Sequence, residues 1–182
     1  ADIAPFDPEN ILRHEWLNSR GAIARFERCA IEIRVLDIQE CPAADLAVAA
    51  AINSALQCLV REAWSSRTEQ NSLAEEELLP ILLACIEAGE GTVIDHAGFL
   101  ALFAFPGARA TAAELWSHLL QDSARLLGGD LPGRQVLDQL LHHGTLASRL
   151  LRAAGNNPGH ERLREIYQQL ARCLAHGELF LP

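Results

Sequence analysis

The chain has 182 residues, a formal net charge of −9 and a sequence pI of about 5.2, and hydrophobic residues make up 49% of it. This length suffices for one domain with a substantial core, and the absence of a clustered basic run argues against nucleic-acid binding. No apolar run approaches the roughly 18–20 residues of a membrane span and no signal-peptide pattern opens the chain, so we expect a cytoplasmic protein that does not bind membranes.

Cysteine, lysine and methionine usage adds two expectations. The five cysteines are scattered without C-x-x-C spacing, which favours buried, reduced thiols. All 15 basic residues are arginine, and the chain contains no methionine. Together with the few strands described next, the missing methionine leads us to interpret the chain as part of a longer polypeptide.

The first elements in chain order are an entry segment over residues 1–17 and two strands over 22–28 and 30–37. In the second strand Ile31 and Ile33 alternate with Glu32 and Arg34, which fits the two-residue period of a strand. One face is therefore β-branched and apolar, and the other carries a carboxylate beside a guanidinium. Pro42, placed for the first turn of a helix, follows the strand.

A long alanine-rich helix is predicted over 43–64, buried against a sheet. Its expected apolar face consists of Leu46, Ala49, Ala50, Ile52, Ala55, Leu56, Leu59 and Val60.

Capping signals predict the remaining helices. Ser72 with Glu75, and Thr111 with Glu114, form capping boxes that open helices towards Gly89 and residue 127, and Pro80 should kink or interrupt the first of them. Shorter helices are expected over 132–142 and 145–154, and a last helix from 157–158 to Gly177.

The fold class expected is α+β: a mostly helical fragment with one or two antiparallel strands. We expect residues 1–182 to form one portion of a single domain, with a strand segment over 1–40 and a helical part over 41–182.

The residues suited to chemistry gather around the second strand. Trp16, Asn18 and Arg20 precede it, and a turn at 19–21 could return Arg20 to Glu32 and Arg34. Mg²⁺ prefers hard oxygen ligands, and arginine holds carboxylate or phosphate bidentately, so this set suits an anionic substrate with Mg²⁺. The alternative is a surface ion pair worth under about 1 kcal/mol.

One other polar pair is a candidate for chemistry. Asp95 and His96 could form an orienting pair, but no Ser or Cys elbow motif accompanies them, which argues against a triad.

Four segments together resemble a known family. They are W-L-N-S-R-G over 16–21, R-C-A-I-E-I-R-V-L-D over 28–37, F-P-G-A-R-A-T-A-A-E-L-W over 105–116, and the helical tail over 163–175. The chain resembles the C-terminal half of the glutamate–cysteine ligase type 2 family, carboxylate–amine ligases that share the glutamine synthetase type of fold.

The resemblance implies an ATP- and Mg²⁺-dependent ligase of glutathione biosynthesis that forms an amide through an acyl phosphate. Glu32 would be the Mg²⁺ ligand, Arg34 and Arg20 catalytic and substrate-binding clamps, and Asn18 a weaker substrate contact. The partners implied are small acid and amine substrates, the N-terminal half of the same polypeptide or a symmetry mate, and a homo-oligomer.

A second reading is a non-catalytic helical interaction or regulatory domain. In that reading the strand around Glu32 and Arg34 is a structural edge, and the helix over 43–64 is a docking face.

Overall fold

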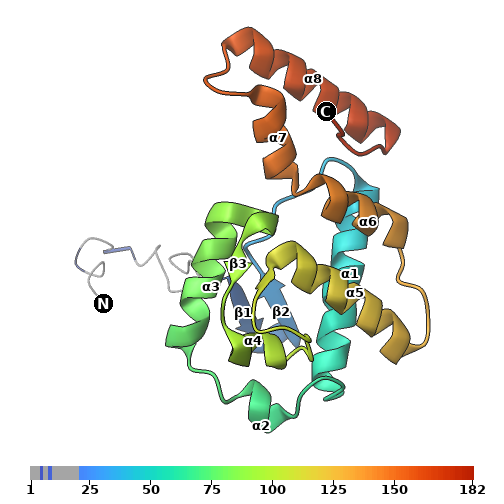
Figure 1. Cartoon of the computed structure of the whole chain (residues 1–182). Coiled ribbons are helices and arrows are strands. Elements are labelled where there is room, and N and C mark those ends of the chain that lie inside the picture. Colours follow the sequence, from blue (N-terminus) through green and yellow to red (C-terminus); the bar gives the residue numbers. More distant parts are fainter. Residues whose placement is uncertain (1–4, 6–7, 10–20) are drawn as a thin grey trace. The chain divides into compact units, whose positions relative to one another are not determined.

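The computed structural model describes residues 5, 8–9 and 21–182, and the predicted site residues Asn18 and Arg20 lie outside them, as does Trp16. The described part is mostly helical with two antiparallel sheets of two strands each, which confirms the α+β class (Figure 1). The chain forms two compact units, Ala1–Asp37 and Ile38–Pro182, and each is described by itself.

The first unit contains a β-hairpin. Strands β1 (Ala22–Arg25) and β2 (Ala30–Ile33) pair antiparallel, with Ile23 opposite Glu32, across a 3-10 turn. Cys29 takes a left-handed conformation (φ 48°) at the end of that turn. Both strands are shorter than predicted, because the turn consumes residues 26–28 and the last pairing bond joins the Arg34 N–H to the Gly21 carbonyl.

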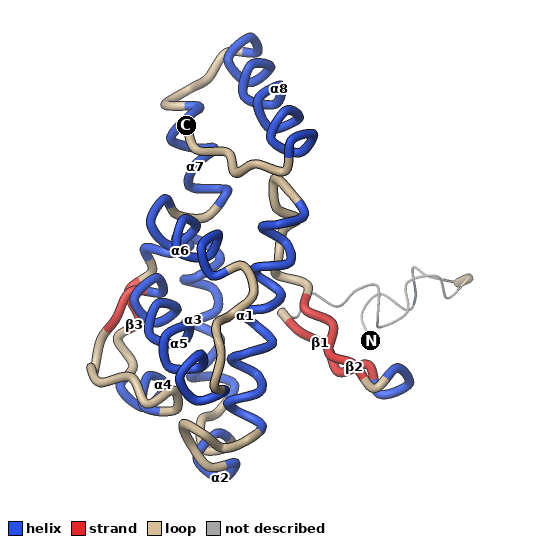
Figure 2. The backbone as a smooth tube through the Cα atoms, turned by 90° about the vertical axis from the view of Figure 1, so that its right-hand side faces the viewer, coloured by secondary structure: helices blue, strands red, loops and turns tan. Residues whose placement is uncertain are grey.

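The second unit is a helical assembly that carries the other small sheet (Figure 2). Its elements are α1 (Pro42–Val60), α2 (Arg67–Gln70), α3 (Glu75–Ala88), a 3-10 turn (Gly89–Gly91), β3 (Val93–Ile94), α4 (Ala97–Ala101), β4 (Ala110–Thr111), α5 (Ala112–Leu127), α6 (Arg134–His143), α7 (Leu146–Ala154) and α8 (His160–His176).

The centre of this unit is α5, which supplies residues to two apolar clusters. One cluster forms around β3, α4 and the start of α5, and its buried members are Ile94, Leu100, Ala110, Ala112, Leu115 and Leu119. Trp64 packs against this cluster, edge-on to Phe103, and its indole N–H donates to Asp122 (2.7 Å). The second cluster joins α5 to α1 and α6, and its buried members are Ala47, Ala51, Leu120, Leu131 and Leu137.

Helix α1 packs through its small residues, not through the face expected from the sequence. Its buried positions recur at helical spacing and are Ala44, Ala47, Ala51, Ser54, Ala55 and Cys58. Leu46 (71% exposed) and Val60 (74% exposed) point outward instead. Small side chains let α1 approach its neighbours closely: a Cβ added to Gly133, before α6, would lie 2.7 Å from the Ala47 Cβ. Leucine side chains would hold the backbones apart, so the predicted face was wrong except at Ala55, its one buried member.

Helix α1 also bears on the expectation about membranes. With 19 residues it is long and apolar enough to cross a membrane by length and composition, contrary to the sequence-based expectation. This is weak evidence for a span, because the core helix of a soluble protein can pass the same test.

Of the two predicted capping boxes, one is confirmed and the other does not form where it was predicted. Thr111 and Glu114 form the predicted box, with the Thr111 hydroxyl accepting from the Glu114 N–H (3.1 Å). Ser72 does not open α3: its hydroxyl donates to the Glu69 carbonyl (2.7 Å) at the end of α2. Helix α3 begins after residue 74 and includes Pro80 without a break, so the predicted interruption does not occur.

The cysteines are all free thiols, but they are not uniformly buried. Cys41 and Cys58 are buried, Cys85 and Cys173 are half-buried, and Cys29 is exposed. The expected packing is therefore correct for the two thiols on the small-residue side of α1 and wrong for Cys29.

A buried ion pair ties distant parts of this unit together. The side chains of Glu40, before α1, and Arg149, on α7, are both fully buried, and they form an ion pair. The Arg149 guanidinium also donates to the carbonyls of Gly144 (3.0 Å) and Phe180 (2.7 Å), and the Phe180 N–H donates to Glu40 (3.1 Å). We call this set the Glu40–Arg149 clasp. It fixes the C-terminal tail to α7 and to the start of α1.

Candidate functional site

Three charged side chains of the β-hairpin share one face. Glu32 and Arg34 are two residues apart, and Arg25 belongs to the strand whose Ile23 lies opposite Glu32. Since successive side chains of a strand alternate between faces, all three project from the same side of the hairpin.

Glu32 lies at the centre of this group. The Arg34 Nε donates to Glu32 Oε1 (2.7 Å), and the Arg25 Nη1 donates to Glu32 Oε2 (3.0 Å). Arg25 also donates through Nε to Glu27 (2.8 Å), at the turn. We refer to Arg25, Glu32 and Arg34 as the hairpin charge cluster.

The two guanidinium groups favour the ionised form of the central carboxyl. The hydrogen bond from Arg34 is the largest influence, and together with the positive charges of Arg34 and Arg25 it lowers the pKa of Glu32 despite some opposing desolvation. Glu32 is therefore a carboxylate at neutral pH, the form that a hard metal cation requires.

The fit to Mg²⁺ can be tested from the donor set. Each Glu32 oxygen accepts one hydrogen bond in the structure and keeps a further lone-pair direction. Among the described residues no group of three His, Cys, Asp or Glu side chains converges as a metal site. A single carboxylate such as Glu32 holds Mg²⁺ only together with other oxygen ligands, for example phosphate oxygens and waters.

The structure brings together Glu32 and Arg34, two of the four predicted site residues, while Asn18 and Arg20 lie outside the described residues. Arg25 was missed. The sequence could have indicated that Ile23 and Arg25 lie on the same face of the first strand. It could not show that Arg25 lies diagonally across from Glu32, because this register depends on the length of the turn.

Asp95 does not orient His96, as the sequence had suggested it could. The His96 Nδ1 accepts the Phe99 N–H (2.9 Å) and so caps α4, and its Nε2 faces Glu77 at 3.6 Å. The carboxylate that faces this histidine is therefore on α3, not at the neighbouring position.

Comparisons with known proteins agree with the sequence resemblance. The model of the glutamate-cysteine ligase family 2 matches residues 7–169. A protein of Archaeoglobus fulgidus, which carries only the description "Uncharacterized protein", is 27% identical over 173 residues. The match covers 94% of this chain, which thus spans 39% of the length of that relative. No solved structure matches the chain.

Proposed function

Because this chain belongs to the glutamate-cysteine ligase family 2, we propose that it is part of an ATP- and Mg²⁺-dependent ligase that joins a carboxylate to an amine. The family match indicates a ligase, and the hairpin charge cluster is the observation that supports the finer proposal. Two arginines flank a single ionised glutamate on a pair of antiparallel strands, an arrangement suited to phosphate and carboxylate groups.

In this proposal the arginines act on the charged oxygens of the substrates. Arg34 and Arg25 each donate to Glu32, and the planar guanidinium fork is the geometry that binds phosphate or substrate carboxylate, so we assign both arginines this role. Positive charge fixed there before the reaction stabilises charge on the transferring phosphoryl group, because it needs no reorganisation during the step. Glu32 orients both arginines and would help to hold Mg²⁺.

The substrates proposed are an acid activated as an acyl phosphate and an amine that attacks it. Mg²⁺, when bound, would neutralise phosphate charge and lower the barrier to phosphoryl transfer. Arg20 and Asn18 stay proposed substrate contacts on the strength of the family resemblance.

The test is Arg34→Lys in the full-length polypeptide that contains this chain. Lysine keeps the charge but cannot form two parallel N–H···O bonds, and a misplacement of about 1 Å can cost on the order of a hundredfold in rate. We expect ligase kcat/KM to fall by at least about tenfold with little change in Tm. Activity is read as amine- and acid-dependent release of ADP.

A matched control is available on the same hairpin. Arg28 is exposed in the 3-10 turn and makes no hydrogen bond to Glu32, so Arg28→Lys should leave kcat/KM unchanged. Glu32→Gln should raise the Mg²⁺ concentration needed for half-maximal activity while the protein folds normally. If Arg34→Lys stays within about twofold of the parent, the cluster is a surface ion pair and not a clamp.

The interaction-domain reading has one observation in its favour, the outward leucine and valine side chains of α1. Binding of Mg²⁺–ATP separates the two functions. If Glu32→Gln and Arg34→Lys both weaken the binding of Mg²⁺–ATP to the full-length polypeptide, the ligase is supported. If neither substitution changes that binding, the interaction domain is supported.

A further inference from the structure

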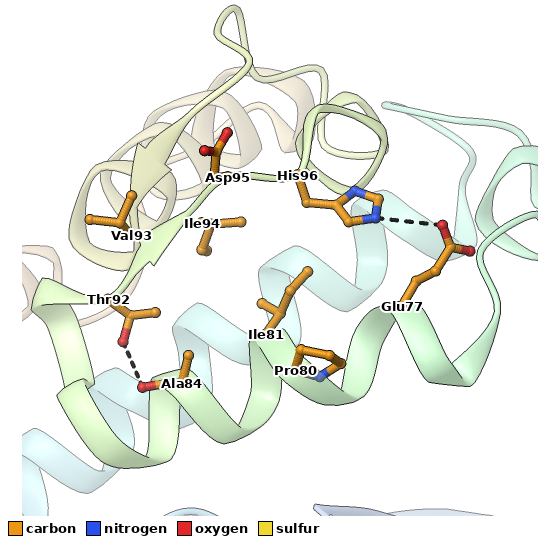
Figure 3. Close-up of a pocket in the computed structure, with 9 residues that line it drawn as sticks. All are labelled: Glu77, Pro80, Ile81, Ala84, Thr92, Val93, Ile94, Asp95 and His96. Carbon is orange, nitrogen blue, oxygen red and sulfur yellow. Dashed lines mark hydrogen bonds and ion pairs between the residues drawn. The ribbon is translucent and has the colours of Figure 1, made fainter.

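A groove of about 370 Å³ runs between α3 and the strand β3 (Figure 3). Five consecutive residues, 92–96, form one wall, and Glu77, Pro80, Ile81 and Ala84 form the other. The helical wall follows i, i+3, i+4, i+7 spacing and is therefore one continuous face of α3. The groove is distinct from the hairpin charge cluster, which belongs to the other unit.

The strand wall presents an unused edge. The Ala112 N–H donates to the Thr92 carbonyl (2.8 Å), and Val93 lies opposite Thr111, so Val93 occupies a non-hydrogen-bonded position of the β3–β4 ladder. At such a position the N–H and C=O point away from the partner strand. Within the described residues, β3 pairs with β4 alone, and no backbone or side-chain group bonds to the Val93 main chain.

The two ends of the groove differ. At one end the Thr92 hydroxyl donates to the Ala84 carbonyl (2.9 Å), which ties strand to helix. The middle is apolar, between Ile81 and Ile94 (Figure 3). At the other end Glu77 Oε1 faces the His96 Nε2 at 3.6 Å, Glu77 Oε2 accepts the Ala74 N–H (2.9 Å), and no arginine lines the groove.

We propose that this groove binds an extended segment of a separate partner protein, which adds as a third strand to the open edge of β3. Main-chain hydrogen bonds to Val93 would give affinity, and alternate side chains would give specificity. Because side chains two apart share a face, the segment carries an apolar residue over Ile81 and a basic residue two positions away, at Glu77.

Charge identifies the partner as a basic segment and not as a second copy. Glu77 follows Glu75 and Glu76 in the first turn of α3, and the chain carries a net charge of −9. Two copies meeting at this end would bring like charges together, whereas a lysine or arginine of a partner would be attracted.

The experiment uses the full-length polypeptide that contains this chain and a fluorescently labelled, blocked peptide Ser-Val-Thr-Arg-Ser, with anisotropy as the readout. We expect saturable binding that weakens by about tenfold or more when the peptide arginine is replaced by glutamate. N-methylation of the peptide backbone removes donors to the strand edge and should abolish binding, although every side chain is kept.

The deciding variant is Val93→Pro, matched by Val93→Thr. Proline removes the N–H that points into the groove but no ladder bond, and Thr92 already has φ −56° and ψ 126°, which a following proline favours. We expect Val93→Pro to keep the parent Tm and lose binding, and Val93→Thr to bind like the parent. Should the proline variant fail to fold, Glu77→Gln must still reduce the preference for arginine over glutamate in the peptide.

Three results overturn the proposal. One is the absence of saturable binding by the parent chain. Another is a folded Val93→Pro that binds the peptide as the parent does. The third is that the parent sediments as a dimer, Val93→Pro sediments as a monomer, and the peptide does not bind the parent. The groove would then be occupied by a second copy of the chain.

Discussion

At the scale of single residues, Glu90 shows how one carboxylate organises a helix start. It sits in the 3-10 turn after α3 and accepts the Thr145 N–H (3.2 Å) and the Ser148 hydroxyl (3.0 Å) at the beginning of α7. Burial acts to raise the pKa of Glu90, but these hydrogen bonds outweigh it, and the pKa is lowered overall.

The lowered pKa fixes the sign of a pH dependence. A depressed folded-state pKa contributes stability above the unfolded pKa and loses it as the pH falls through the folded value. We expect Glu90→Gln to lower the free energy of unfolding by about 1 kcal/mol at pH 7, as loss of a helix cap does. The difference from the parent should shrink below about pH 4.3, where glutamate ordinarily titrates.

Urea unfolding at several pH values measures this difference. Glu87→Gln is the control, because Glu87 is exposed near the end of α3 and makes no hydrogen bond with another described side chain. If Glu90→Gln lowers the free energy of unfolding by the same amount from pH 7 to pH 3, the shape of the side chain and not its charge matters at this position.

At the scale of elements, α1 has two faces of opposite character, and substitutions on them should behave differently. Ala51→Leu inserts a larger side chain where α1 meets α5 and α6, and overpacking of this kind costs about 1–3 kcal/mol. Leu46→Ser, on the outward face, should stay within about 0.5 kcal/mol of the parent. Thermal unfolding followed by circular dichroism reports both. Equal losses from the two substitutions would contradict the observed packing.

The same helix shows where sequence reasoning fails. Pro42 and the alanine-rich composition located α1 well, because both are local signals. The buried face could not be found, since ranking residues by hydrophobicity selects leucine over alanine, whereas close helix packing selects alanine over leucine. Likewise the Thr111–Glu114 box was found because it is local, but the same local pattern at Ser72 was misleading, since the Ser72 hydroxyl donates to the Glu69 carbonyl at the end of α2.

At the scale of the whole molecule, the Glu40–Arg149 clasp holds segments that are more than a hundred residues apart. Glu40→Gln leaves the Arg149 charge buried without its carboxylate partner, and losing one member of a buried pair costs about 3–5 kcal/mol. We expect a loss of that size in the free energy of unfolding, with part of it recovered in Glu40→Gln combined with Arg149→Met.

Arg152→Met provides the comparison, because Arg152 belongs to the same helix but is exposed. It should change the free energy of unfolding by less than about 0.5 kcal/mol. A Glu40→Gln protein as stable as the parent would mean that the clasp contributes nothing to the fold.

The clasp also marks the limit of prediction for the molecule as a whole. Arg149 stands among apolar positions of α7, which signals a buried charge that needs a partner, but nothing in the sequence pairs it with Glu40. Two of the three residues of the hairpin charge cluster were predicted, and the third was missed for the same reason. Glu32 and Arg34 are two residues apart on one strand, whereas Arg25 reaches Glu32 only through a cross-strand register.

The contact between Gly133 and Ala47 has a consequence for how sequences of this family can diverge. Gly133 has φ +74°, so its left-handed backbone favours glycine, and its missing side chain is what admits the Ala47 methyl group. The two positions should therefore change together in evolution. A residue larger than alanine at 47 requires α6 to shift outward. Aligned relatives should accordingly keep both residues small or replace both, and mixed pairs should be rare.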